Sequence, residues 1–330
     1  MEYVTLKAAD LKVSKLSLGT WSFSGSKNWG PNDEKESINT INLAIDLGIN
    51  FLDTAAKYND GVAEEILGKA VKGRRSEVIL ATKIHTALLG YDSVIKECEG
   101  SLKRMQTDYV DLYQIHWPSK TIPFEETMSA FEKLKADGKI RAIGVCNAGV
   151  KAMQGYSGHA IVTNQLPYSL LWRQIEDEIV PEAIKQNISV WPYCPLAQGL
   201  LTGKFKTVED VPLSRRDIRF YSSEWKQGMH SDAGYEKEIF AFLPKLQAIA
   251  DKAGVPMATL ALAFLKKAKG VDSVLVGARN ETQLKDNLKM FETEVSDDIM
   301  REVMKISDEL KPQMGTNPDL WQSADAERVF

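Results

Sequence analysis

The sequence predicts a single α/β domain folded as a (β/α)8 TIM barrel. Eight short apolar runs recur along the 330 residues, and segments with helical periodicity lie between them. The main alternative is an open, doubly wound sheet. No two glycines stand two positions apart, so the G-x-G-x-x-G fingerprint of its dinucleotide-binding form is absent, and no Walker A motif is present. The closed barrel is therefore the better fit.

The expected strands and helices alternate along the chain. The strands are residues 16–20, 49–53, 77–83, 110–116, 140–145, 160–165, 188–193 and 272–277. A first helix is expected after Asp33, which stands three residues before Glu36 as in a capping box. Further helical patterns occupy 62–72, 92–105, 124–137, 176–187, 280–290 and 296–311, several of them closed by glycine.

Two long stretches interrupt this alternation within the predicted domain 1–330. Residues 203–235 separate the seventh strand from its helix, and residues 312–330 follow the last helix as an extended arm. Long loops in barrels often cover the active site, whereas a disordered surface loop is the alternative.

The bulk composition narrows the class of partner. A hydrophobic content of 44% and a charged content of 26% are typical of a soluble globular protein. With 41 basic and 45 acidic residues, the net charge of −4 gives no support for a nucleic-acid or membrane partner. The three cysteines lack C-x-x-C spacing, and the N-terminus has no apolar signal segment, so we expect a cytoplasmic protein. No His or Cys pair has the spacing of a metal-ligand motif, and no metal is expected.

Polar side chains stand where three consecutive expected strands end. Asp53 closes "INFLD", Lys83 closes "EVILATK", and His116 closes "VDLYQIH", while Tyr58 follows Asp53 in the adjoining loop. The carboxyl ends of barrel strands meet at one face, so these four groups are expected to lie together there.

This set has a coherent acid–base chemistry. A tyrosine titrates near pH 10 and is a weak acid at neutral pH unless a cation stabilises its phenolate, which is the role expected of Lys83. Asp53 would hold Lys83 by a charge-assisted hydrogen bond, and His116 would orient a carbonyl oxygen or relay a proton. Taken singly, Asp53 also reads as a turn residue and Tyr58 as a surface aromatic.

Longer stretches of the chain resemble the aldo-keto reductases. The similarity is carried, in order, by "LGTW", "FLDTAAKYNDGVAEEILGKAV", "ATKIH", "LKRMQTDYVDLYQIHWP", "GKIRAIGVCN", "NQLPYSLL", "PYCPLAQGLLTGKF" and "VLVGARNETQLKDNL". The branch it resembles most includes bacterial general aldehyde reductases and the β-subunits of voltage-gated potassium channels. That resemblance implies a (β/α)8 barrel and a catalytic tetrad, which maps onto Asp53, Tyr58, Lys83 and His116.

The resemblance also implies that NADPH or NADP+ binds. Asn147 and Gln165 match residues that bind the nicotinamide carboxamide, and Tyr193 matches the aromatic that stacks on the ring. Basic groups at the adenosine end favour the 2′-phosphate, and hence NADPH over NADH. The full set of expected cofactor contacts is Thr20, Trp21, Asp53, Asn147, Gln165, Tyr193, Cys194, Pro195, Leu196, Gln198, Lys204, Arg219, Gly277, Arg279, Gln283 and Asn287.

Some of these residues also have interpretations that do not involve a cofactor. Lys204 and Arg219 lie in a charged loop, where solvated charges are common. The stretch "GARN" also reads as a strand-to-helix turn with Asn280 as the helix cap.

The function predicted from the sequence is NADPH-dependent reduction of aldehydes or ketones to alcohols, with Tyr58 as the proton donor. Trp21 and Trp117 are expected to wall the pocket for a small carbonyl substrate, unless they pack only against barrel helices. A nucleotide-binding, redox-sensing regulatory subunit is the alternative. A metal-assisted hydrolase or isomerase with Asp53 and His116 as ligands is a third reading. The physiological substrate and the oligomeric state stay open.

Overall fold

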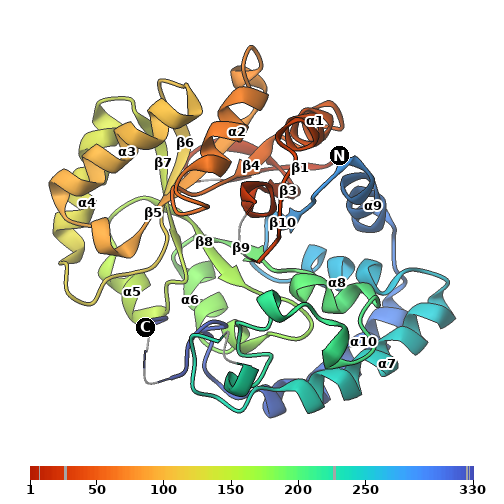
Figure 1. Cartoon of the computed structure of the whole chain (residues 1–330). Helices are drawn as coiled ribbons and strands as arrows, with labels where there is room; N and C mark the ends of the chain where they lie inside the picture. Colours follow the sequence, from red (N-terminus) through yellow and green to blue (C-terminus); the bar gives the residue numbers. More distant parts are fainter. Residues whose placement is uncertain (7, 26–27, 226–227, 325, 327) are drawn as a thin grey trace.

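Eight parallel strands form the barrel in this computed structural model, which describes every residue except 7, 26–27, 226–227, 325 and 327 (Figure 1). The strands neighbour one another in the order β10-β3-β4-β5-β6-β7-β8-β9. A parallel bridge between Val190 of β9 and Val271, just before β10, joins the two ends of this order. The predicted (β/α)8 barrel is confirmed. The strands are β3 (Leu16–Gly19), β4 (Phe51–Asp53), β5 (Ile79–Ile84), β6 (Val110–Ile115), β7 (Ile140–Cys146), β8 (Ile161–Pro167), β9 (Ser189–Tyr193) and β10 (Val274–Gly277).

Helices surround the barrel, and the expected ones are present. Asp33 caps α1, because its side chain accepts a hydrogen bond from the N–H of Glu36. Helix α7 is the one expected after residues 203–235, whereas α5 and α8 were not expected. Nine of the ten residues of α8 are buried, so its sequence has no amphipathic pattern. The helices are α1 (Glu34–Asp46), α2 (Val62–Ala70), α3 (Tyr91–Met105), α4 (Phe124–Ala136), α5 (Val150–Gly155), α6 (Ile179–Lys185), α7 (Glu236–Ala253), α8 (Met257–Lys266), α9 (Glu281–Glu292) and α10 (Asp297–Leu310).

An antiparallel hairpin precedes the barrel and was not predicted. It consists of β1 (Tyr3–Leu6) and β2 (Leu11–Ser14). The buried side chains of the hairpin belong to the same apolar cluster as residues of the barrel interior. In this cluster the rings of Phe51 and Trp191 stack with centroids 4.0 Å apart. This cluster, termed the plug below, fills the barrel interior beneath its polar end, and the hairpin contributes to it.

The barrel interior changes from apolar to polar along four of the strands. Side chains two positions apart share one face of a strand, so an apolar residue of the plug is followed by a polar one on the same face. The pairs are Phe51 and Asp53, Ala81 and Lys83, Leu112 and Gln114, and Trp191 and Tyr193. In the strand register Lys83 stands opposite Gln114, whereas Asp53 stands opposite Ala81, two residues before Lys83. A layer of polar groups thus rests directly on the hydrophobic plug.

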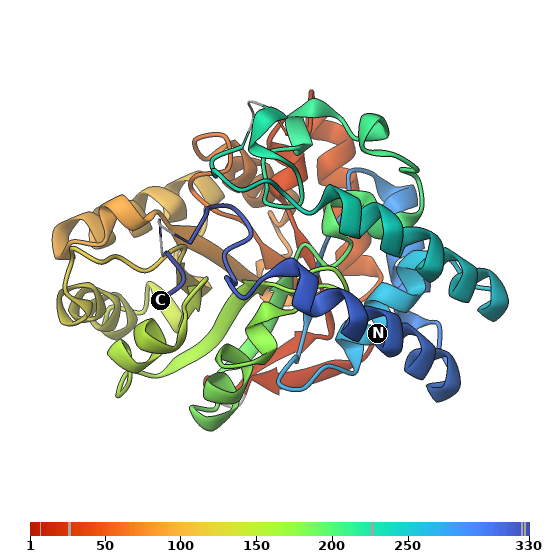
Figure 2. The same ribbon diagram turned by 90° about the horizontal axis from the view of Figure 1, so that it is seen from below.

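The arm at residues 312–330 is tied to the barrel by hydrogen bonds along its described part (Figure 2). Trp172 Nε1 donates to the carbonyl of Pro318 at 2.9 Å, and the N–H of Ala152 donates to the carbonyl of Phe330 at 2.8 Å. The loop at 203–235 contains short 3-10 helices at Val208–Asp210, Leu213–Arg215 and Ser223–Trp225. Residues 226–227 of this loop and residues 325 and 327 of the arm lie outside the described residues.

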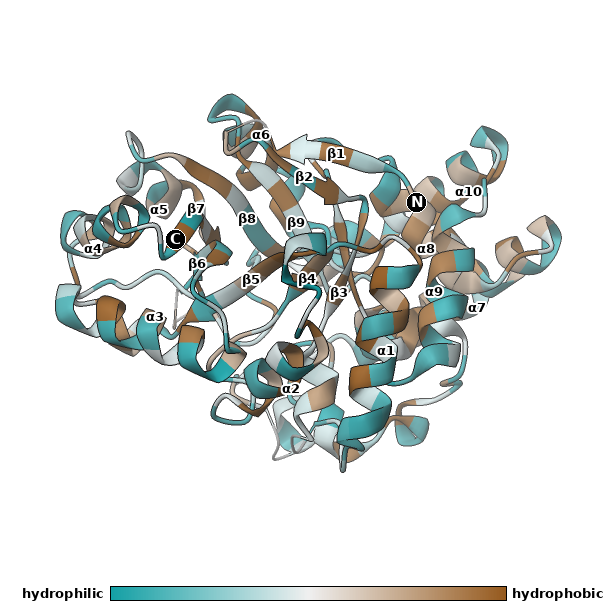
Figure 3. Cartoon of the chain, turned by 90° about the horizontal axis from the view of Figure 1, so that it is seen from above, coloured by the Kyte–Doolittle hydropathy of each residue, from teal (hydrophilic) through white to brown (hydrophobic). Residues whose placement is uncertain are grey.

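Hydrophobic residues follow the barrel strands, and hydrophilic residues predominate on the outer faces of helices such as α1 and α3 (Figure 3). Among the described residues, no single helix has both the length and the apolar character to cross a membrane. Helices α7 and α8 pass that test of length and composition only as a pair, which is bent by 91°.

Replacing Phe51 by Ala removes one of the two stacked rings in the plug. We expect the free energy of unfolding to fall by about 3–5 kcal/mol, because the plug cannot refill the lost volume. Denaturant titration measures this change, with Leu213→Ala, whose side chain is 54% exposed, as the control. A loss below about 1 kcal/mol for Phe51→Ala would show that the plug does not stabilise the barrel.

Candidate active site

Lys83 occupies the centre of the polar layer, with its ammonium fully buried. The Nζ atom donates to Asp53 Oδ2 at 2.6 Å, to the carbonyl of Thr54 at 2.8 Å and to the hydroxyl of Tyr58 at 3.1 Å. These three contacts use all three N–H donors of the ammonium. Strand β5 supplies Lys83, and β4 with the turn after it supplies the three acceptors.

Asp53 is bonded on both carboxylate oxygens. Its Oδ1 accepts hydrogen bonds from Gln114 Nε2 at 3.2 Å and from Gln165 Nε2 at 3.1 Å. Gln114 was not singled out in the sequence, although it lies on β6 two residues before His116, which directly follows the strand, and this spacing puts both on one face. The thiol of Cys146 donates to Gln114 Oε1 at 3.6 Å, which holds this amide from its other end.

The Lys83–Asp53 pair keeps its charges in the barrel interior. Burial lowers the pKa of Lys83, but the negative charge of Asp53 and the Tyr58 hydroxyl together outweigh it, and the net pKa is raised. Burial also raises the pKa of Asp53, and the ion pair with Lys83 opposes that shift. The proton stays on Lys83 at neutral pH.

Tyr58 is a protonated phenol in this environment. Burial raises its pKa to about 12, and the nearby Lys83 lowers the pKa without cancelling the effect of burial. The cation therefore acts as expected from the sequence, but the dry surroundings have the larger effect. Tyr58 holds its proton at neutral pH while its oxygen lies 3.1 Å from a fixed positive charge.

His116 completes the four-residue group. Its ring lies at 79° to that of Tyr58, with centroids 6.0 Å apart. The pKa of His116 is well below the ordinary value of 6.5 because the ring is buried, with further lowering by the charges of Lys83, His85 and Arg328. Its buried Nδ1 has no hydrogen-bond partner within the described part of the chain. The structure thus brings together all four residues of the predicted tetrad, with His116 as a neutral imidazole.

A second chain of hydrogen bonds links the arm to the same strand ends. Trp321 Nε1 donates to the Tyr193 hydroxyl at 3.0 Å, and this hydroxyl donates to Asn147 Oδ1 at 2.9 Å. Asn147 Nδ2 in turn donates to the carbonyl of His116 at 3.0 Å. Trp321 was not predicted as a site residue, because nothing in the sequence indicates where the arm lies.

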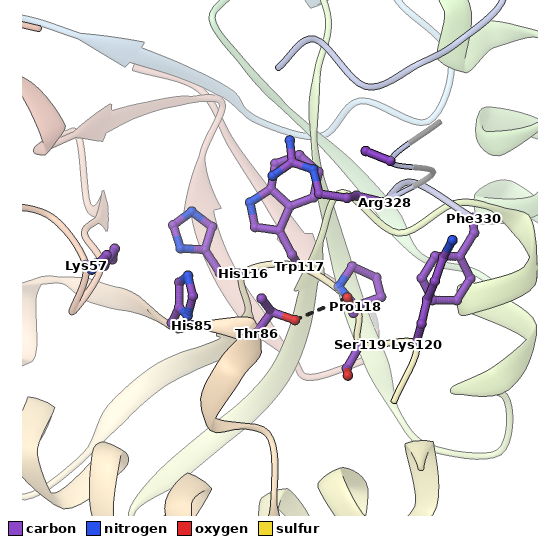
Figure 4. Close-up of a pocket in the computed structure, with 11 residues that line it drawn as sticks. Lys57, His85, Thr86, His116, Trp117, Pro118, Ser119, Lys120, Arg328 and Phe330 are labelled. Atoms are coloured by element: carbon purple, nitrogen blue, oxygen red, sulfur yellow. Dashed lines mark hydrogen bonds between the residues drawn. The ribbon is translucent and has the colours of Figure 1, made fainter. Parts of the chain in front are cut away.

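The two predicted pocket tryptophans have different surroundings. The Trp21 ring stacks against Tyr58 with centroids 6.1 Å apart, and it meets the edges of Trp29 and Trp321. Trp117 lines a pocket of about 350 Å³ that reaches His116 (Figure 4). The guanidinium of Arg328, from the arm, covers the Trp117 ring at 3.8 Å. Only Trp117 is a wall of this pocket, whereas Trp21 covers Tyr58.

The turn after β9 has an unusual backbone. Cys194, Ala197 and Gln198 all adopt left-handed φ angles, of 54°, 48° and 53°. Such non-glycine conformations cluster at ligand sites, where the surroundings hold them in place. Pro195 and Leu196 lie within the same turn, and the Gln198 Nε2 atom is buried without a hydrogen-bond partner among the described residues. Thr20 Oγ1, at the end of β3, is likewise buried without a hydrogen-bond partner among the described residues.

Three basic side chains gather beside this turn, and one of them was not predicted. Burial lowers the pKa of Lys204, followed by the charges of Arg215 and Arg279. Burial likewise lowers the pKa of Arg215, and Arg279 adds to the effect. Lys204, Arg215 and Arg279 are termed the basic cluster below. Like charges held together in a half-buried place favour an anionic ligand.

Arg219 does not lie in the basic cluster. Its guanidinium is buried, forms an ion pair with Asp232, and donates to the carbonyls of Asn317 at 3.1 Å and Asp319 at 2.6 Å. It also donates to the Tyr235 hydroxyl at 3.2 Å. Arg219 therefore fastens the arm to the loop at 203–235, whereas Arg215, four residues earlier, belongs to the basic cluster.

The remaining predicted cofactor residues follow β10. Asn280 caps α9 by accepting a hydrogen bond from the N–H of Gln283, as predicted from the strand-to-helix turn in the sequence. The Gln283 side chain accepts from the N–H of Arg279 at 3.0 Å, and Asn287 Nδ2 donates to the carbonyl of Gly277 at 3.0 Å. These contacts order the turn that presents Arg279. Across the described residues, no group of three or more His, Cys, Asp or Glu side chains is arranged to hold a metal ion.

Comparison with known families agrees with this geometry. Residues 15–308 match the model of the aldo/keto reductase family. The chain belongs to this family. The match covers all eight barrel strands, so it includes every strand end that contributes to the site.

Curated relatives extend over most of the chain. The aldo-keto reductase YhdN of Bacillus subtilis is 38% identical over 298 residues, covering 86% of this chain and 87% of that protein. The NADH-specific methylglyoxal reductase of Escherichia coli is 32% identical, covering 92% and 98%. A probable voltage-gated potassium channel subunit beta of Arabidopsis thaliana is 30% identical, covering 88% and 90%.

The fold also matches solved structures. An aldo-keto reductase from Klebsiella pneumoniae in complex with NADPH superimposes with a TM-score of 0.74 at 28% identity, covering 97% of this chain and 99% of that chain.

The environment of His116 predicts its titration. We expect its imidazole to keep neutral-form NMR shifts as the pH is lowered from about 8 to about 6, because burial and nearby cations disfavour the charged ring. The unfolded chain binds this proton more readily, so His116 reduces the stability of the fold as the pH falls below the ordinary value of 6.5. Histidine-labelled protein compared with His116→Gln identifies the signal. A midpoint at or above 6.5 would contradict this description.

Proposed function

We propose that the chain is an NADPH-dependent reductase that converts aldehydes, and also ketones, to alcohols. The observation that supports it best is the protonated Tyr58 hydroxyl, held 3.1 Å from the buried Lys83 ammonium and beside the neutral His116 ring. A proton donor next to a fixed cation is suited to a carbonyl oxygen that gains negative charge.

The residues present fit a nicotinamide dinucleotide. Tyr193, Asn147 and Gln165 stand at adjacent strand ends, where an aromatic face and two amides suit a nicotinamide carboxamide. The buried polar atoms of Thr20 and Gln198 lack partners within the described chain, which suits a polar ligand along the turn after β9. Beyond that turn, the basic cluster suits a phosphate group.

Each residue of the tetrad has a distinct part in the proposed reaction. When bound, the nicotinamide supplies hydride to the carbonyl carbon. Tyr58 donates its proton to the carbonyl oxygen, and Lys83 stabilises the phenolate that remains. His116, neutral at physiological pH, orients the carbonyl oxygen by donating a hydrogen bond. Asp53 keeps the Lys83 ammonium fixed and charged.

The preference for NADPH rests on the basic cluster. Family membership alone does not decide it, since the Escherichia coli relative is NADH-specific. A 2′-phosphate adds negative charge at the adenosine end, and Lys204, Arg215 and Arg279 supply three positive charges. Methylglyoxal, the substrate named for that relative, is a suitable first aldehyde for assays.

A regulatory subunit is the second candidate, favoured by the similarity to the Arabidopsis channel subunit. Such a protein would bind the cofactor with little turnover, so intact tetrad residues do not separate the two functions. The rate of NADPH oxidation does. An enzyme consumes NADPH when an aldehyde is added, whereas a sensor shows cofactor binding with no aldehyde-dependent rate.

Tyr58→Phe tests the proposed proton donor. We expect kcat for aldehyde reduction, followed by NADPH absorbance at 340 nm, to fall by about 10²–10⁴-fold, because only the hydroxyl is removed. NADPH affinity, measured by fluorescence titration, should stay within about threefold of the wild type. Equal kcat in both proteins would rule out the role assigned to Tyr58.

Arg215→Gln tests the source of the NADPH preference. We expect the Kd for NADPH to rise by about 10-fold or more while the Kd for NADH changes little, because a charged hydrogen bond contributes about 1.5–3 kcal/mol. Arg219→Gln is the matched control. It should reduce stability and expose the arm to proteolysis, without changing the ratio of the two Kd values. If Arg219→Gln changed the ratio of the two Kd values and Arg215→Gln did not, the result would contradict the placement of Arg215 in the basic cluster.

A further inference from the structure

Gln114 is a fully buried amide to which the proposed reaction assigns no part. Leu112, two positions earlier on the same face of β6, packs in the plug. An apolar side chain at position 114 would extend the plug by one more residue. A buried amide loses its hydration, and only hydrogen bonds compensate for that loss. The contacts of Gln114 therefore indicate why an amide stands here.

Both ends of this amide are engaged. Its Nε2 donates to Asp53 Oδ1 at 3.2 Å, and its Oε1 accepts from the thiol of Cys146 at 3.6 Å. Burial raises the pKa of Cys146, so the thiol keeps the proton that it donates. If the amide were reversed, its oxygen would face a carboxylate oxygen. Gln114 therefore presents a donor to Asp53.

The neighbouring strand leaves room for the Gln114 side chain. Gly144 of β7 stands opposite Gln114 in the strand register. A Cβ atom at position 144 would lie 3.0 Å from Gln114 Cγ and 2.5 Å from Thr163 Oγ1. Both distances are shorter than the about 3.5–4.0 Å of an ordinary contact between carbon atoms. A side chain at position 144 would push Gln114 away from Asp53, so the glycine belongs to the arrangement.

The second amide on Asp53 is placed differently. Gln165 Nε2 donates to the same Oδ1 atom at 3.1 Å, but Gln165 also stands where the proposed function requires an amide for the nicotinamide. Its side chain has to serve both Asp53 and the cofactor, so its contact with Asp53 changes as the cofactor enters and leaves. Gln114 has no such second task, because its partners Asp53 and Cys146 are both buried in the barrel interior.

We propose that Gln114 is a positioning residue for the reductase reaction, which holds Asp53 Oδ1 in every state of the cofactor site and so keeps the Lys83 ammonium fixed beside Tyr58. This inference rests on the proposed reductase function and adds to it a residue that touches neither substrate nor cofactor. Lys83 bonds to the other carboxylate oxygen, Oδ2, so the two contacts together fix the plane of the carboxylate. While Gln165 serves the cofactor, Gln114 prevents this plane from rotating.

The titratable groups around Asp53 come from four elements. Lys83 lies on β5, Tyr58 on the turn after β4, Cys146 on β7 and His116 directly after β6. Tyr58 and Cys146 hold their protons at neutral pH, and His116 is a neutral ring. Lys83 thus supplies the positive charge that faces Asp53.

The charge of Asp53 depends on its hydrogen bonds as well as on Lys83. Burial raises the pKa of Asp53, and Lys83, Gln165 and Gln114 oppose that shift. Loss of the Gln114 donor therefore raises the pKa of Asp53 further. Asp53 then takes up a proton at a higher pH than in the wild type, so activity is lost earlier as the solution is acidified.

Gln114→Met tests this role, because methionine has nearly the same shape and no N–H donor. We expect kcat for aldehyde reduction to fall by about 10-fold or more, since a hydrogen bond to a charged group is lost. The acidic limb of the kcat pH profile should move up by about one pH unit. The Kd for NADPH should stay within about threefold of the wild type, because Gln114 does not touch the cofactor.

Gln174→Met is the matched control. Gln174 is also a buried amide, and its Nε2 donates to the carbonyls of Met314 and Gly315 at 3.3 and 3.4 Å. Its replacement should lower the stability of the fold without moving the acidic limb.

Gln114→Glu is a second variant, which tests the proposal even if Gln114→Met is unstable. The introduced carboxyl group has the shape of the amide and donates to Asp53 while it is protonated, so at about pH 6 we expect kcat within about fivefold of the wild type. As the pH rises towards about 8, two carboxylates come to face each other, and kcat should fall where the wild type stays active.

The inference is overturned if Gln114→Met moves the acidic limb no more than Gln174→Met does, or if Gln114→Glu shows no loss of kcat with rising pH. A weaker Kd for NADPH with unchanged kcat in Gln114→Met would also overturn it, because Gln114 would then belong to the cofactor site. Each of these results leaves the reductase function intact. If the wild type oxidised no NADPH with any aldehyde, the reductase function would be refuted, and the inference with it.

Discussion

The buried ion pair between Lys83 and Asp53 is the interaction on which the rest of the site depends. Two charges in a barrel interior lose their hydration, and a 2.6 Å contact alone does not compensate for that loss. The barrel supplies the remaining partners, which are the carbonyl of Thr54 and the amides of Gln114 and Gln165. Tyr58 takes the last ammonium hydrogen. The proposed proton donor is thus positioned by the same bonds that make the buried charges tolerable.

The fold keeps this arrangement rigid from below and covered from above. Below it, the stacked rings of Phe51 and Trp191 and the N-terminal hairpin exclude water from the interior. Above it, the arm places Trp321 against Trp21 and Tyr193, and Arg219 anchors the arm through two carbonyls. Low polarity around the pair explains why burial has a larger effect than Lys83 on the pKa of Tyr58.

Features that depend on local periodicity were predictable from the sequence, and those that depend on tertiary packing were not. Buried parallel strands are continuous apolar runs, so the strands and the polar residues at their ends were located correctly. Helix α8 is apolar on all sides, so it lacks the single apolar stripe by which an amphipathic helix is recognised in a sequence. Whether Arg215 or Arg219 lies in the basic cluster depends on the path of the loop around the short helix Leu213–Arg215. Residue types alone do not specify that path. The position of Trp321 likewise depends on long-range contacts of the arm.

The most direct test of this account is a double-mutant cycle between Asp53→Asn and Lys83→Met, read as the kcat of NADPH-dependent aldehyde reduction. If the ion pair acts as one unit, each single variant loses most of the activity and the double variant loses little more than Lys83→Met alone, which gives a coupling of about 2 kcal/mol or more. Additive losses would show that Asp53 and Lys83 act independently, and would contradict the central role assigned to their pairing.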